Sequence, residues 1–171
     1  MVFDKKKSLK VSPDVHLPNF GYSALKSDLY LDLMEVTILR QNNAAHFQSL
    51  SENCRTLEVD GSIALNGVGE GMSPMEALLA SVGTCAAIDV VAILEKQRQT
   101  LTDLKVKVRG ERRDSPPPRP FTEIHIHFQI AGNVDEQKVA HAVELAVEQY
   151  CSVKESLDPS IPVTYSHEII L

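Results

Sequence analysis

Apolar and polar residues alternate in three short segments near the start of the patterned part of the chain. The segments are separated by Asn42-Asn43 and by Ser51-Glu52-Asn53, which favour turns. They run over residues 34–41, 44–51 and 55–61. We expect a small antiparallel meander. Residues 61–72, with glycines at 61, 67, 69 and 71, show no period and predict a flexible loop.

A long helix is predicted from residue 73 to about residue 97. Ser73 can cap it, Pro74 suits the first helical position, and Glu76 completes a capping box. Apolar residues then cover nearly its whole circumference, which predicts a helix buried on most sides. Its uncharged interior, between Glu76 and Asp89, is shorter than the roughly 18 residues of a membrane span. The pattern therefore favours a core helix.

The second half of the chain alternates again and then changes to a helical period. Residues 104–109 and 124–130 predict two strands joined through the proline-rich stretch 113–120, and 134–150 predicts an amphipathic helix that ends just before Cys151. A last strand is expected over 163–171. This order predicts an α+β fold with mainly antiparallel sheets. One sheet covers only one side of a buried helix, so we expect a partner subunit on the other.

Composition limits the classes of protein and of partner. A chain of 171 residues, 43% of them apolar, suits one domain, which we place at 34–171 with residues 1–33 as an extension or peripheral arm. A net charge of −6 disfavours binding to nucleic acid or to an anionic membrane. The first residues lack the apolar run of a secretory signal, so we expect a reducing cytoplasm, where structural disulfides are rare.

The cysteines are the candidate chemical groups. Cys85 lies inside the long helix and Cys151 at the end of the second one, whereas Cys54 lies beside a turn and is interpreted as incidental. Cys85 can be a small packing residue, or it can be a nucleophile with Cys151 as its resolving partner. The second reading requires the two thiols to converge and a donor or cation to stabilise the thiolate. Asp89, one turn after Cys85, is interpreted as a structural carboxylate.

Metal and cofactor binding find little support in the residue spacing. Candidate ligands are present, but none has the C-x-x-C or H-x-x-x-H spacing of a zinc site. They are Cys85, Cys151, His125, His127 and His141. The glycines near Gly67 match neither the P-loop nor the dinucleotide pattern. We expect no bound metal and no bound cofactor.

Three motifs together resemble the osmotically inducible protein C and organic hydroperoxide resistance family (OsmC/Ohr), over about residues 34–171. The motifs are Ser-Pro-Met-Glu-Ala-Leu-Leu-Ala at 73–80, Gly-Thr-Cys-Ala-Ala at 83–87 and Tyr-Cys-Ser-Val at 150–153. The resemblance implies an OsmC-like fold, in which sheets wrap long buried central helices in an intertwined homodimer. It places the thiol sites at the subunit interface.

The resemblance also implies a reaction. In the family's enzymes the thiol of the central helix attacks a peroxide and becomes a sulfenic acid, and the second cysteine captures it as a disulfide that an external thiol or lipoyl group reduces. By position, Cys85 would be the peroxidatic residue and Cys151 the resolving one. The family's glutamate follows the helix-start proline directly, but here Met75 intervenes before Glu76. The family's arginine has Arg40 as its counterpart, and Arg55 and Arg113 are alternatives. These departures suggest a less-characterised OsmC-like branch.

Three functions remain open from the sequence. The first is a cytoplasmic thiol peroxidase that acts on hydrophobic hydroperoxides. The second is a non-catalytic module that binds an apolar small molecule, with thiols that are inert or act as sensors. The third, a protein thiol-disulfide oxidoreductase, is weaker because no C-x-x-C motif is present.

Overall fold

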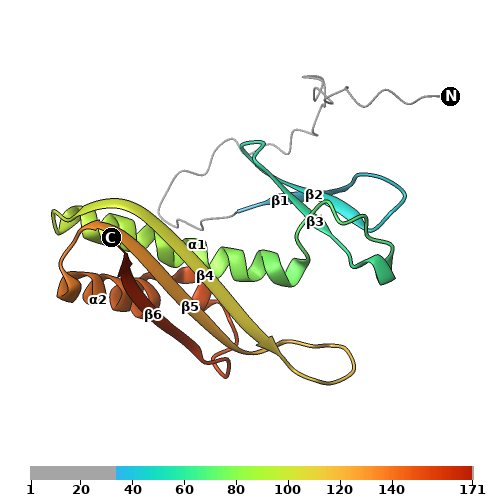
Figure 1. The fold of residues 1–171 in the computed structure, drawn as a ribbon. Coiled ribbons are helices and arrows are strands. Elements are labelled where there is room, and N and C mark those ends of the chain that lie inside the picture. Colours follow the sequence, from blue (N-terminus) through green and yellow to red (C-terminus); the bar gives the residue numbers. More distant parts are fainter. Residues whose placement is uncertain (1–33, 171) are drawn as a thin grey trace, which may run out of the picture. The chain divides into compact units, whose positions relative to one another are not determined.

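Two three-stranded sheets, one long helix and one shorter helix are the main elements of the computed structural model, which describes residues 34–170 (Figure 1). The first sheet contains β1 (Val36–Arg40), β2 (His46–Ser51) and β3 (Thr56–Asp60). The strands pair antiparallel in chain order, which confirms the predicted meander. The extension predicted for residues 1–33 lies outside the described residues.

The glycine-containing segment after β3 has more structure than its sequence suggests. It forms a short 3-10 helix, η1 (Ile63–Leu65), and Met72 pairs with Val59 as a parallel bridge. The carboxylate of Asp60 is buried and accepts hydrogen bonds from the backbone N–H groups of Val68 at 3.1 Å and Glu70 at 3.0 Å. A buried carboxylate needs such donors, so Asp60 fixes the course of this segment.

Helix α1 (Pro74–Lys96) begins at the predicted capping box. The Glu76 N–H donates to Ser73 Oγ at 3.3 Å, and the Ser73 N–H donates to Glu76 Oε2 at 2.8 Å. These two bonds satisfy backbone donors that a helix start otherwise leaves unpaired.

The second sheet contains β4 (Thr100–Arg112), β5 (Phe121–Asn133) and β6 (Val163–Ile170). Strands β4 and β5 form the predicted hairpin around the proline-rich loop, and Figure 1 shows them as one long curved pair. Strand β6 pairs with β5 in parallel, so the sheets are mainly rather than wholly antiparallel.

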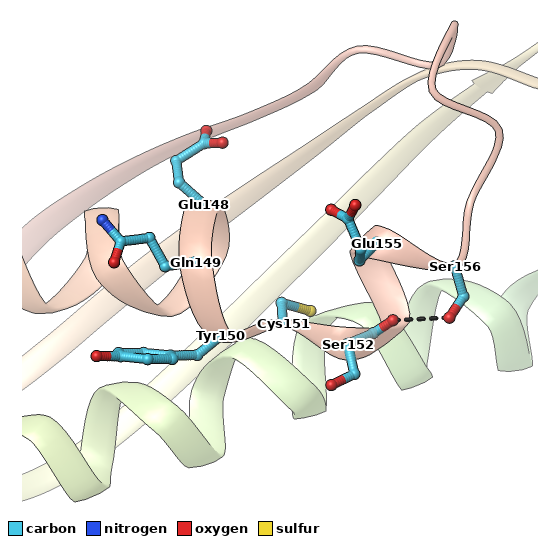
Figure 2. Close-up of a pocket in the computed structure, with 7 residues that line it drawn as sticks. All are labelled: Glu148, Gln149, Tyr150, Cys151, Ser152, Glu155 and Ser156. Atoms are coloured by element: carbon cyan, nitrogen blue, oxygen red, sulfur yellow. Dashed lines mark hydrogen bonds between the residues drawn. The ribbon is translucent and has the colours of Figure 1, made fainter.

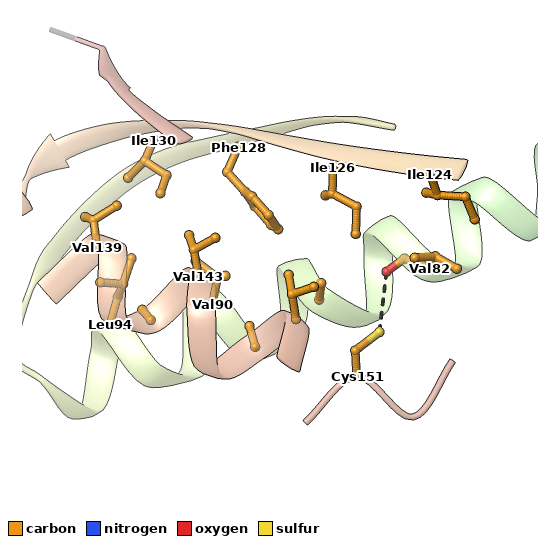
Figure 3. Packing of buried hydrophobic residues seen from close by; sticks show 14 of the residues in the cluster. Val82, Val90, Leu94, Ile124, Ile126, Phe128, Ile130, Val139, Val143 and Cys151 are labelled. Carbon is orange, nitrogen blue, oxygen red and sulfur yellow. Dashed lines mark hydrogen bonds between the residues drawn. The ribbon is translucent and has the colours of Figure 1, made fainter. Parts of the chain in front are cut away.

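The predicted second helix is α2 (Glu136–Leu145), continued by one π-helical turn, η2 (Ala146–Tyr150), and followed by the short α3 (Ser152–Glu155). The core lies where α1 and α2 pack on one face of β5 (Figure 3). Its largest buried side chains come from these three elements and from η2: Val82, Val90, Leu94, Ile124, Ile126, Phe128, Ile130, Val139, Val143 and Val147.

In the single chain, the fully buried residues of α1 lie on one side only, and burial on most sides, which requires a partner subunit, stays a prediction. Its buried residues follow one stripe, Val82, Gly83, Ala86, Val90 and Leu94, while Ile88 is 64% exposed. The reason is that one sheet and one helix cover a single face. By length and composition alone α1 is apolar enough to cross a membrane, with a mean hydropathy of 2.2 over an 18-residue window, but core helices of soluble proteins also pass this test.

Candidate functional site

Helix α1 holds Cys85 against the core. A Cβ atom at Gly83 would collide with Val108 of β4, so the glycine allows the helix to approach the sheet closely just before the cysteine. Cys85 is half-buried and packs against the core cluster. The thiol is therefore presented from a rigid element rather than from a loop.

Cys151 lies at the break between two helical segments. The backbone leaves the helix there, with φ −70° and ψ 90°, and α3 begins at the next residue. The residue is only 3% exposed. Its Sγ accepts a hydrogen bond from the N–H of Lys154 at 3.4 Å and contacts the carbonyl oxygen of Val82 at 3.8 Å (Figure 3). The thiol thus acts as the N-cap of α3 while it points toward α1.

The two predicted thiols lie together in the structure. The contact with Val82 places Cys151 Sγ against α1 within one helical turn of Cys85. Both cysteines carry free thiols, as does Cys54. Burial raises the pKa of the Cys151 thiol, hydrogen bonds from the N–H groups of Lys154 and Val153 oppose this, and the neighbouring Cys85 thiol raises it further. The convergence that the sequence required but could not show is present.

Cys54 does not share this site. It is exposed in the turn between β2 and β3, with a positive φ of 56°. The interpretation that it is incidental stays a prediction.

The two other predicted site residues have local partners. The Glu76 carboxylate accepts hydrogen bonds from the N–H and from the Oγ of Ser73, both at 2.8 Å, and these bonds lower its pKa. Arg40 Nε donates to the Ala44 carbonyl at 2.7 Å in the β1–β2 turn. Within residues 34–170 no hydrogen bond joins Glu76 or Arg40 to Cys85 or Cys151.

The alternative arginines also lie in turns. Arg55 is exposed after the β2–β3 turn, and its N–H donates to Ser51 Oγ at 3.2 Å. Arg113 begins the loop between β4 and β5, and its carbonyl oxygen accepts a hydrogen bond from Arg119 Nε at 3.0 Å. Within residues 34–170 the guanidinium group of neither arginine makes a hydrogen bond to a cysteine.

A hollow of about 370 Å³ borders Cys151 (Figure 2). Its lining is mostly polar: Glu148, Gln149, Tyr150, Cys151, Ser152, Glu155 and Ser156. Tyr150 also borders a second hollow of about 360 Å³, which includes Asp89, Ile93 and Leu145. The first hollow therefore gives small molecules an approach to Cys151 from the side of η2 and α3.

Lys154 is the functional neighbour that sequence reasoning missed. Its N–H donates to Cys151 Sγ, and its ammonium binds Glu148 Oε2 at 2.8 Å. The sequence feature that could have indicated Lys154 is the Cys151-Ser152 pair, which follows the predicted second helix at a point where a new helix could start. Cysteine is not among the preferred N-cap residues, so the pattern did not indicate α3.

The candidate metal ligands do not form a metal centre in the described part of the chain. No group of three His, Cys, Asp or Glu side chains within residues 34–170 has the arrangement to hold an ion. His125 and His127 instead both contact Ser166 Oγ, at 2.9 and 2.8 Å, and His127 also contacts Glu168 at 3.3 Å. These imidazoles belong to a hydrogen-bonded row across β5 and β6.

Known proteins are similar to this chain in sequence or in fold. Protein YhfA of Escherichia coli (strain K12) is 43% identical over 106 residues, which cover 61% of this chain and 78% of YhfA. A hypothetical protein from Aquifex aeolicus VF5 is 31% identical, with a TM-score of 0.67 and coverage of 81% of this chain and 98% of that one. An organic hydroperoxide resistance protein OsmC from Legionella pneumophila is 15% identical, with a TM-score of 0.61 and coverage of 81% and 98%, and shows a common fold.

The sequence model of the OsmC-like protein family matches residues 67–166, which include α1 with Cys85 and the segment that carries Cys151. The match spans more than half of the chain. Together with the identity to YhfA, it shows that the chain belongs to the OsmC-like protein family.

Proposed function

We propose that this protein is a thiol-dependent peroxidase that reduces organic hydroperoxides through Cys85 and Cys151. The observation that carries the proposal is the meeting of the two thiols between α1 and the η2–α3 break. Family membership supports a peroxide-related redox role. The names of two structural neighbours, from Legionella pneumophila and Elizabethkingia anophelis, describe organic hydroperoxide resistance proteins.

The reaction follows from the chemistry of thiols. The Cys85 thiolate attacks the hydroperoxide, an S–O bond forms, the O–O bond breaks, and the alkoxide leaves as an alcohol after protonation. Cys85 is then a sulfenic acid. Cys151, as its thiolate, attacks the Cys85 sulfur, and the hydroxyl group leaves as water. The product is a Cys85–Cys151 disulfide, which an external thiol or lipoyl group reduces.

A homodimer supports this function by covering the exposed face of α1. Ile88 is 64% exposed on that helix, and Ile38 of β1 is 65% exposed. Exposed apolar side chains on these two elements suit an interface, and a two-fold partner offers the same surface in return. The interface then gives an apolar hydroperoxide a site near Cys85. A reducing cytoplasm suits such an enzyme because it keeps the resting thiols reduced.

The alternative is a binding module for an apolar small molecule, and one observation favours it. Arg40 and Glu76, the counterparts of the family's activating residues, are both engaged by local backbone groups. Among residues 34–170 no arginine or lysine side chain makes a hydrogen bond to Cys85 that would stabilise its thiolate. In this alternative the thiols would be inert or would act as sensors.

Intact-mass spectrometry after one equivalent of cumene hydroperoxide tests the proposal. We expect rapid loss of two hydrogens, mapped to a Cys85–Cys151 disulfide, and a trapped sulfenic acid at Cys85 in the Cys151→Ser variant. Cys54→Ser is the matched control and should behave as the wild type. An unmodified Cys85 at low peroxide excess would exclude the peroxidase and favour the binding module.

A further inference from the structure

Cys151 borders the 370 Å³ hollow, and its sulfur also contacts α1. In a Cys85–Cys151 disulfide, Cys151 would therefore be the half that borders the solvent-accessible hollow. Cys85 belongs to α1 and packs against the core cluster. A second thiol that enters the hollow meets Cys151.

The hollow has an excess of negative charge. Glu148 and Glu155 both line it. The ammonium of Lys154 binds Glu148 at 2.8 Å, whereas no ion pair among residues 34–170 includes Glu155. The neighbouring Tyr165 responds to one of these charges: burial raises its pKa most, the carboxylates of Glu148 and of Glu144 outside the hollow raise it further, and the Lys154 ammonium lowers it.

We propose that this hollow is the entry site of the reductant, that the reductant attacks Cys151, and that Glu148 and Glu155 select neutral or cationic small thiols over anionic ones. The inference rests on the proposed function, because its substrate is the Cys85–Cys151 disulfide. It assigns to Glu148 and Glu155 a role in specificity.

The reaction takes place in two exchanges. The thiolate of the reductant attacks Cys151 Sγ, a mixed disulfide forms, and the Cys85–Cys151 bond breaks with its electron pair on the Cys85 sulfur, which takes a proton from water. A second reductant thiol, from the same or another reductant molecule, then attacks the reductant sulfur that is bonded to Cys151. The mixed disulfide breaks, and Cys151 leaves as a thiolate. The two thiols supply two electrons and two protons. The N–H of Lys154, which donates to Cys151 Sγ at 3.4 Å, is placed to stabilise that leaving thiolate.

The experiment starts from protein oxidised with diamide, so that no peroxidase activity is needed. Its disulfide is reduced with 3-mercaptopropionate, 2-mercaptoethanol or cysteamine at equal thiolate concentration. These thiols carry an anionic, neutral or cationic group. We expect cysteamine to react roughly three- to thirtyfold faster than 3-mercaptopropionate at low salt, with the ratio falling as salt is added.

Variants assign the selectivity to the two glutamates. Glu155→Gln and Glu148→Gln should each reduce the ratio, and Glu148→Gln should do so more because it also frees the Lys154 ammonium. Glu123→Gln, an exposed change on β5, is the control and should leave the ratio unchanged. An unchanged ratio in both hollow variants would overturn the proposed selection.

Alkylation with N-ethylmaleimide during the first exchange locates the attacked sulfur. We expect the maleimide on Cys85 and the reductant on Cys151, and the reverse pattern would overturn the inference. Failure of diamide to link the two cysteines would overturn it as well. If diamide forms the disulfide and the charge order holds while cumene hydroperoxide does not react, the peroxidase proposal fails and the entry site remains.

Discussion

The backbone N–H of Lys154 donates a hydrogen bond to Cys151 Sγ at 3.4 Å, which makes a thiol the cap of a helix. The bond depends on the turn from η2 into α3, because only there does the chain fold back on the sulfur. It offers the thiolate a donor inside a site that otherwise disfavours charge. The ionisation of Cys151 therefore depends on both burial and its helical neighbours.

Replacing Cys85 with Ser should lower the pKa of Cys151, because the neighbouring thiol helps to raise it. The pKa should still lie above its ordinary value of 9.0, since burial is the largest cause of the shift. Rates of iodoacetamide alkylation, followed against pH with peptide mapping, measure both values. Exposed Cys54 is the internal reference and should react alike in both proteins. A higher midpoint for Cys151 in the variant would contradict the described contact.

The same shift affects stability in alkaline solution. The folded chain holds the proton of Cys151 more tightly than the unfolded chain, so the residue's contribution is complete below pH 9.0. It should be lost as the pH rises through the pKa of the folded state. Urea denaturation at neutral and at alkaline pH measures the free energy of unfolding. This free energy should fall less with rising pH for Cys151→Ala than for the wild type.

Gly83→Ala should destabilise the fold by about 1–3 kcal/mol, although alanine is the better helix former. The added Cβ would collide with Val108, so α1 must move from β4 and carry Cys85 with it. Chemical denaturation measures the loss. Ser81→Ala, an exposed change on the same helix, is the control and should have little effect. Equal stability of the two variants would mean that the helix can shift without cost.

Local signals explain why most elements could be predicted from sequence. The capping box at Ser73 and Glu76 and the alternation over β5 depend on neighbouring residues only. The parallel pairing of β6 depends on where the chain returns after α3, which no local pattern encodes. The exposed face of α1 likewise reflects which elements are available to cover it.

The candidate site was predictable in its residues but not in its geometry. Cys85 and Cys151 could be selected as candidates, because the three motifs are fairly specific in combination although each alone is weak. Their convergence depends on tertiary packing, since a break in the second helix turns Cys151 Sγ toward Val82. The local bonds of Arg40 and Glu76 depend on turn and cap geometry, which spacing alone does not show.

Glu76→Gln tests whether this residue does more than cap α1. The carboxylate accepts hydrogen bonds from the N–H and from the Oγ of Ser73. Ser73→Ala keeps the first bond but removes the second, together with the Oγ that caps the Glu76 N–H, and should cost ~1 kcal/mol. If capping is its whole role, both variants lower the melting temperature and neither changes the rate of sulfenic acid formation at Cys85. Stopped-flow peroxide consumption measures that rate. A slower reaction in Glu76→Gln but not in Ser73→Ala would show a role in the chemistry.

Asp60→Asn should lower the melting temperature at neutral pH by several degrees. Burial alone would raise the pKa of Asp60, but the N–H donors of Glu70, Val68 and Gly69, with the charge of His46, lower it below 3.8 overall. A lowered carboxyl pKa stabilises the fold above the unfolded value, and this contribution is lost as the pH falls through the folded value. The difference in melting temperature between Asp60→Asn and the wild type should therefore become smaller at acid pH. Asp103→Asn, at an exposed position, should show no such trend.

Ile88→Glu should separate the proposed dimer into monomers. The side chain is 64% exposed in the single chain, on the face of α1 opposite the buried stripe, and in the proposed dimer the partner covers it. A carboxylate buried there without a partner should cost at least about 2 kcal/mol of association free energy, roughly thirtyfold in the dissociation constant. Sedimentation velocity over a range of concentrations measures the change, with Glu123→Lys on β5 as the control. A monomeric wild type would contradict the interface, and the apolar face of α1 would then need a different cover, such as the small molecule of the alternative function.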